Sequence, residues 1–148
     1  MKAHKYLRAY LAGIATPTMF LLVVMTGYTV LRYVYDFPVP VERVIVFPMA
    51  VVPNLWGLWN VLFLAAGSRY PLSLGLHGAI LPILLAPLGI FFASLLDIHV
   101  LIQNAGIGAH DAASWMSLLI AAPVVGLLAY YFAWKYIVGF LNRVVDLA

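Results

Sequence analysis

The chain alternates long apolar stretches with short polar ones, and the apolar stretches are long enough to cross a lipid bilayer. Residues 9–31, 44–66 and 72–96 contain no Asp, Glu, Lys or Arg, and residues 115–137 contain only Lys135. A membrane-spanning helix needs roughly 20 consecutive apolar residues. The pattern therefore predicts an all-α membrane protein whose four transmembrane helices form an antiparallel bundle.

Composition supports the same class of protein. Hydrophobic residues make up 66% of the chain and charged residues 9%, against roughly 45–50% and 25% in soluble domains. Because the connections between four spans are short, no segment can form a separate soluble catalytic domain, and residues 1–148 are predicted to be a single transmembrane domain. The chain has no cysteine, which excludes thiol redox chemistry, thiolate zinc sites and iron–sulfur clusters.

The distribution of basic residues predicts the orientation in the membrane. Most of them fall on one side of the four-span pattern, namely Lys2, Lys5, Arg8, Arg69, Lys135 and Arg143. Cytoplasmic loops are enriched in Lys and Arg, so both termini are expected in the cytoplasm, with the protein in a bacterial inner membrane. Anionic lipid headgroups account for the net charge of +3, and no nucleic-acid partner is expected. Tyr and Trp side chains, including Trp134, lie near the predicted span ends, as is typical of membrane interfaces.

Every predicted span contains proline, at Pro17, Pro48, Pro53, Pro82, Pro87 and Pro123. A proline inside a helix removes one backbone hydrogen bond and clashes with the preceding turn, so kinked helices are predicted. Irregular backbone at membrane depth often lines a site. Proline is also more common in transmembrane helices in general, so packing alone is the alternative interpretation.

Five polar side chains form a candidate ligand-binding layer in the cytoplasmic half of the predicted bundle. Asn54 lies near the bilayer midplane, while Asn60 and His77 lie roughly 7–9 Å inside the ends of neighbouring helices. Thr16 and Thr18 reach a similar depth. An unpaired amide in hydrocarbon is costly, so these groups should face the bundle, a partner subunit or water.

Two interpretations of this layer stay open. The polar side chains could line a ligand site, or they could simply join helices through hydrogen bonds, which contribute about 0.6 kcal/mol each in membranes. Trp56 and Trp59 are three residues apart and share a helix face, where they could form a ligand wall or pack against neighbouring helices.

Other kinds of chemistry have weaker support. Four side chains between the last two spans are weak candidates for a divalent metal, but they lack an ordered spacing and no metal site is predicted; they are Asp97, His99, His110 and Asp111. Only His77 lies well inside a span, so one chain offers no histidine pair for haem, and no cofactor is predicted. Because Asp and Glu are absent from the spans, no catalytic residue is predicted and an enzyme is not expected.

Small residues at four-residue spacing favour close helix packing within the bundle or between copies; they are Gly75/Ala79, Gly89/Ala93, Ala122/Gly126 and Ala129/Ala133. The leading hypothesis is an oligomeric transport or small-ligand or lipid-binding protein, in contact with membrane lipids. The alternative is a non-catalytic accessory subunit of a larger membrane complex, such as a respiratory or transport complex. A quinone- or haem-associated oxidoreductase subunit is the third hypothesis.

Overall fold

The computed structural model describes residues 2–36, 47–67, 71–97 and 112–147, and the secondary structure in these ranges is helical throughout. In chain order the elements are α1 (Lys2–Val34), η1 (Phe47–Val51), α3 (Val52–Ala66), α4 (Leu74–Leu95), α6 (Ala112–Phe132), η3 (Ala133–Val138) and α7 (Gly139–Val144). The two η elements are π-helical. Since η1 runs directly into α3, and α6 through η3 into α7, the described chain forms four continuous helical runs.

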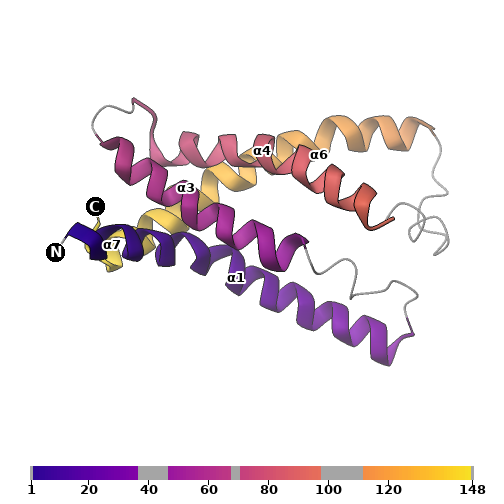
Figure 1. Cartoon of the computed structure of the whole chain (residues 1–148). Helices are drawn as coiled ribbons and strands as arrows, with labels where there is room; N and C mark the ends of the chain where they lie inside the picture. The colour runs from indigo at the N-terminus through magenta and orange to yellow at the C-terminus, as the bar shows by residue number, and fades with distance from the viewer. Residues whose placement is uncertain (1, 37–46, 68–70, 98–111, 148) are drawn as a thin grey trace.

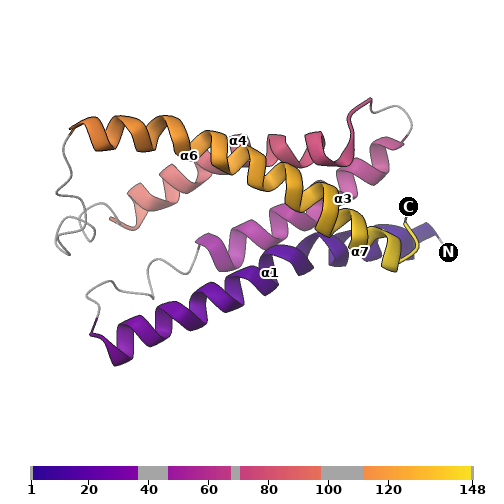
Figure 2. The same ribbon diagram turned by 180° about the vertical axis from the view of Figure 1, so that it is seen from behind.

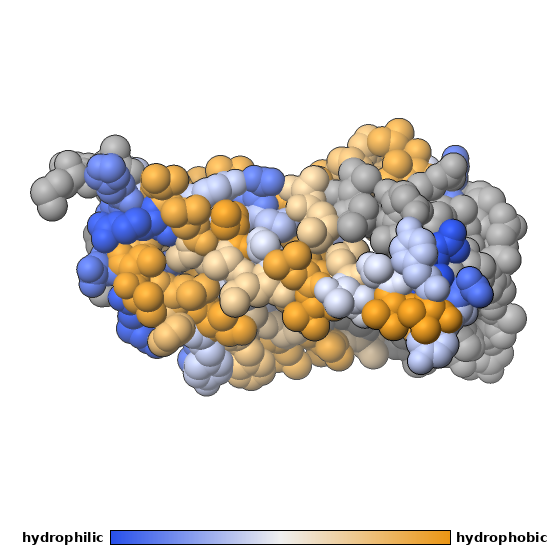
Figure 3. Space-filling model, turned by 90° about the horizontal axis from the view of Figure 1, so that it is seen from below, coloured by the Kyte–Doolittle hydropathy of each residue, from blue (hydrophilic) through white to orange (hydrophobic). Residues whose placement is uncertain are grey.

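Each of these four runs contains a stretch long and apolar enough to cross a membrane, at His4–Val34, Pro48–Ala66, Leu74–Leu95 and Pro123–Val144. The predicted class, an all-helical chain with four potential membrane spans, is confirmed for the described residues. Figure 3 shows hydrophilic residues mainly at the two ends of the molecule, with a mostly hydrophobic surface between them. The last run continues past residue 137, where the predicted span ends. Lys135 therefore lies inside the helix rather than at its end.

Residues with positive φ angles follow these helices. Asp36, Asp97 and Asp146 have φ angles of 49°, 52° and 56°, and Gly67 has a φ of 53°. Asp and Gly adopt this conformation more readily than bulky residues do, which makes them suitable helix terminators. The prolines are accommodated within the runs: Pro53 lies in the first turn of α3, while Pro17, Pro82, Pro87 and Pro123 lie inside longer helices.

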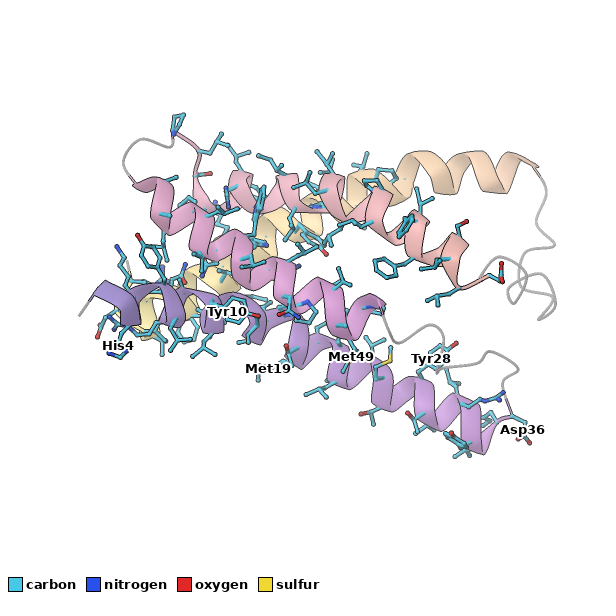
Figure 4. All side chains as sticks on the ribbon, in the orientation of Figure 1. His4, Tyr10, Met19, Tyr28, Asp36 and Met49 are labelled. Atoms are coloured by element: carbon cyan, nitrogen blue, oxygen red, sulfur yellow. The ribbon has the colours of Figure 1, made fainter. Side chains whose placement is uncertain are left out.

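The helices are packed unevenly along their length. α1 lies beside α3, and α4 lies beside α6, while both termini lie at the same end of the molecule (Figures 1 and 2). The hydrophobic core cluster lies toward this end and consists of Trp56, Leu81, Leu85, Trp134 and Val138. Along α1, His4 lies at the end near the termini and Asp36 at the opposite end (Figure 4).

Three glycines permit the close helix contacts around this core. A Cβ atom on Gly13 would lie 2.7 Å from the Trp56 carbonyl oxygen, and one on Gly57 would lie 2.5 Å from the Tyr10 ring. On Gly78, a Cβ would lie 2.0 Å from Trp134 Cγ. Lipid tails are as apolar as the side chains, so such close packing and hydrogen bonds hold membrane helices together.

We predict that Gly78→Ala destabilises the protein, because the added methyl group would overlap the buried Trp134 ring. Overpacking typically costs about 1–3 kcal/mol, and a contact this close to a fully buried ring should reach at least that range. The apparent melting temperature in detergent measures the loss.

Gly126→Ala is the matched control, because a Cβ at Gly126 meets nothing within 4 Å. Alanine has the higher helix propensity, so this variant should be as stable as the unmodified protein or more so. Equal melting temperatures for both variants would contradict the packing described for Gly78.

Candidate functional site

A pair of buried asparagines joins three helices near the termini. The side chains of Asn60 in α3 and Asn142 in α7 are 0% and 4% exposed. Asn60 Nδ2 donates to Asn142 Oδ1 over 2.8 Å and to the Ala9 carbonyl oxygen of α1 over 2.8 Å, and Asn142 Nδ2 donates back to Asn60 Oδ1 over 3.1 Å. Both amide hydrogens of Asn60 are therefore used, which removes the desolvation cost expected for this side chain in an apolar environment.

A second contact holds the same two chain ends together. The guanidinium of Arg8 donates from Nη1 to the Val145 carbonyl oxygen over 2.9 Å. Val145 immediately follows α7, where the last carbonyl groups of a helix lack partners within the helix. A cation at this position also interacts favourably with the helix dipole. Arg8 therefore caps α7 from the first turns of α1.

The remaining polar candidates on α1 and α3 serve local contacts. Asn54 is exposed, donates from Nδ2 to the Ala50 carbonyl oxygen over 2.6 Å, and accepts a hydrogen bond from the Tyr10 hydroxyl. Thr18 donates to the Ile14 carbonyl oxygen of its own helix over 2.7 Å. Thr16 is different, because its hydroxyl oxygen is buried and makes no hydrogen bond with the described residues.

His77 is locked against Trp59 by a reciprocal pair of hydrogen bonds between α3 and α4. Trp59 Nε1 donates to the His77 carbonyl oxygen over 2.8 Å, and His77 Nε2 lies 3.0 Å from the Trp59 carbonyl oxygen. Because a carbonyl oxygen can only accept, this contact places the hydrogen of a neutral imidazole on Nε2. The two rings also stack, with centroids 4.7 Å apart and planes inclined by 20°.

Aromatic rings surround this pair and continue into the core. Phe63 packs on His77 with centroids 5.1 Å apart, and Trp134 meets His77 edge-on at 5.8 Å. Trp134 also packs on Trp56 at 5.3 Å. Further along, Tyr130 lies 5.0 Å from Trp56. We call these six side chains, Trp56, Trp59, Phe63, His77, Tyr130 and Trp134, the aromatic layer.

One indole group of the aromatic layer is buried as a hydrogen-bond donor without an acceptor. Trp134 is 0% exposed, and its Nε1 atom makes no hydrogen bond with the described residues. Trp56 is 4% exposed, but its indole lies beside the Tyr130 side chain and interacts with it. Buried tryptophans ordinarily satisfy this N–H group, because leaving a polar group unpaired costs about 1–3 kcal/mol. The Trp134 donor is the strongest chemical feature of the site.

The structure thus brings some predicted site residues together and leaves others apart. Trp56, Trp59 and His77 belong to the aromatic layer, whereas Asn60 pairs with Asn142 and Asn54 with Tyr10. Whether any of them binds a ligand stays a prediction.

Metal and haem ligands have little geometric support in the part of the chain that is described. Within it, no three His, Cys, Asp or Glu side chains lie close enough together to hold a metal ion. Asp97 is exposed after α4, while His99, His110 and Asp111 lie outside the described residues. His77 Nε2 is directed at the Trp59 carbonyl oxygen, so this nitrogen would have to give up that contact to bind iron.

Sequence reasoning missed Asn142 and the burial of Trp134. Asn142 lies beyond residue 137, where the predicted fourth span ends, and Trp134 is fully buried in the core. A signal was present, since Trp134, Val138 and Asn142 follow one another at four-residue spacing and so share one helix face. All three are buried.

No protein-family model matches the chain, and neither a curated protein nor a solved structure is significantly similar to it.

We predict that Asn60→Leu and Asn142→Leu each lower the free energy of unfolding by about 1–3 kcal/mol, because each leaves the partner amide buried without its hydrogen bonds. The double variant should lose less than the sum of the two single losses. Unfolding in mixed detergent measures all three variants, and a double-mutant cycle extracts the coupling, expected at about 0.6–1.7 kcal/mol.

Asn54→Leu is the control for this cycle, because Asn54 is exposed and pairs with a different helix. Its loss should add to that of Asn142→Leu without coupling. Purely additive losses for Asn60 and Asn142 would contradict the pairing.

Proposed function

We propose that this chain is an integral membrane protein that crosses the bilayer four times in alternating directions, with proline-kinked helices and both termini in the cytoplasm. Two observations support this topology: both termini lie at the same end of the molecule (Figure 1), and Lys and Arg are concentrated on the corresponding side of the sequence pattern. Location in a bacterial inner membrane rests on this charge bias alone.

Within this topology, we propose that the protein binds a small apolar molecule carrying a hydrogen-bond acceptor, such as a carbonyl group. The observation that carries the proposal is the buried, unpaired indole N–H group of Trp134. A carbonyl oxygen would satisfy a donor that hydrocarbon cannot. The flanking rings of the aromatic layer would contact the apolar body of such a molecule. Quinones and acyl esters belong to this chemical class.

Transport by a homo-oligomer is the extension of this proposal. A bundle of this size has little room for an aqueous path of its own, so a transported molecule would most naturally pass between copies. The support for oligomers is the open helix face at Gly126, where a Cβ atom would meet nothing within 4 Å and another helix could approach closely.

Trp134→Phe tests ligand binding, because it keeps an aromatic ring in the core and removes the indole N–H. Native mass spectrometry of protein extracted gently from its own host membranes should show a bound small molecule on the unmodified protein. We expect its retention to fall about twofold to twelvefold in the variant, which is the range for one lost hydrogen bond of about 0.5–1.5 kcal/mol.

Thermal shifts with two matched probes identify the chemistry. Decyl-1,4-benzoquinone carries carbonyl acceptors and decylbenzene does not, so only the quinone should raise the melting temperature. Equal shifts with both probes, or no bound molecule in the native spectrum, would overturn the proposal.

A specific observation favours a second candidate, the accessory subunit of a larger membrane complex. From Leu22 to Asp36, α1 is exposed at every position except Met25, Tyr28 and Arg32. This segment includes Thr26 and Thr29, whose hydroxyls donate only to carbonyl groups of their own helix in the bonds described. A foreign helix could cover such a face. A stoichiometric set of foreign subunits in the native spectrum, in place of a bound small molecule, would support this candidate.

A further inference from the structure

The side chain of Lys135 lies on the outer surface of a membrane-spanning helix. It belongs to η3, inside the span Pro123–Val144, and is exposed. A charged group on a lipid-facing surface is costly unless it reaches the headgroup region or meets a charge of opposite sign. No described carboxylate forms an ion pair with it.

Packing against α4 fixes the depth of Lys135. A Cβ atom on Gly75 would lie 3.2 Å from Lys135 Cβ and 2.8 Å from the Tyr131 ring. Gly75 is the second residue of α4, directly after Leu74, where the third span begins. Lys135 and Tyr131 therefore lie level with the first turn of α4, from which the long Lys135 side chain extends to the lipid headgroups.

Two tyrosines hold the ammonium group from either side. Lys135 Nζ lies 5.6 Å from the centroid of the Tyr131 ring and 5.3 Å from that of the Tyr136 ring. Cation–π contacts at this distance orient the side chain without neutralising its charge. Tyr136 is itself 57% exposed, so the group has a cation and two phenol hydroxyl groups at the membrane surface. This combination of one fixed positive charge and hydroxyl donors matches a phosphate group.

We propose that Lys135, Tyr131 and Tyr136 form a binding site for the phosphate of an anionic phospholipid headgroup. Membrane lipid is the source that fits, because the site faces outward at headgroup level. Anionic lipid is favoured over zwitterionic lipid, since a neighbouring choline would place a second cation near Lys135. The site is separate from the aromatic layer and does not depend on the ligand proposed there.

Lipid retention measured by native mass spectrometry tests this site. The full-length protein is reconstituted in nanodiscs containing equal amounts of phosphatidylglycerol and phosphatidylcholine of matched acyl chains, and then released with its bound lipids. We expect the unmodified protein to retain phosphatidylglycerol preferentially. Lys135→Gln should lower this preference about fivefold, in keeping with the contribution of one basic residue near a membrane surface.

Arg143→Gln is the matched control, because Arg143 is another exposed cation on the same helical run. It should keep most of the preference. Tyr131→Phe, which retains the ring against Gly75 and removes the hydroxyl, should lower the preference by a smaller factor than Lys135→Gln. Melting temperatures close to that of the unmodified protein confirm that both variants at this site are folded.

Three results would overturn the proposal. Equal losses for Lys135→Gln and Arg143→Gln would indicate diffuse surface charge rather than a site. Equal retention of the two lipids by the unmodified protein would exclude selection for an anionic headgroup. Displacement of phosphatidylglycerol by millimolar inorganic phosphate would assign the group to free phosphate instead of lipid.

Discussion

The contact between Asn60 and Asn142 is the interaction on which the arrangement of the helices depends. In lipid, burial of apolar side chains does not by itself draw helices together, so specific hydrogen bonds and close backbone contacts must do so. The amide pair joins α3 to α7, and the bond from Asn60 to the Ala9 carbonyl oxygen adds α1. The remaining helical run, α4, is attached differently. It is held by the reciprocal contact of His77 with Trp59 and by the fit of Gly78 against Trp134.

These attachments all lie in the half of the molecule near the termini, and this explains where chemistry can occur. The opposite half of α1 is mostly exposed, and the hydroxyl groups of Thr26 and Thr29 donate to carbonyl groups of the same helix. The half near the termini combines buried amides, an imidazole and the unpaired indole donor of Trp134. A binding site in a protein of this size needs rigid surroundings, because the side chains that bind the ligand must be held in place by packed neighbours. The aromatic layer is packed in this way, because Trp56, His77 and Trp134 are buried.

The sequence was sufficient to predict the helices, because runs of more than 20 residues without charge leave one structural solution in a bilayer. It also predicted that Asn60 must find a partner, from the cost of burying an amide. The identity of that partner could not be obtained, since it depends on the relative rotation and depth of two helices. Asn142 follows Lys135 by seven residues. The charge of Lys135 marks the end of the fourth span in the hydropathy pattern, but the helix continues beyond it to Asn142. The stacking of Trp59 on His77 likewise depends on packing that no local pattern encodes.

The position of Asn142 in the chain also bears on biosynthesis. Asn60 and Ala9 are synthesised before Asn142, whose side chain completes the amide pair. Until α7 is synthesised, the Asn60 side chain lacks this partner, and an unpaired amide in an apolar environment is unfavourable. The helices α1, α3 and α4 therefore form an incomplete intermediate, and the synthesis of α7 completes its hydrogen bonds.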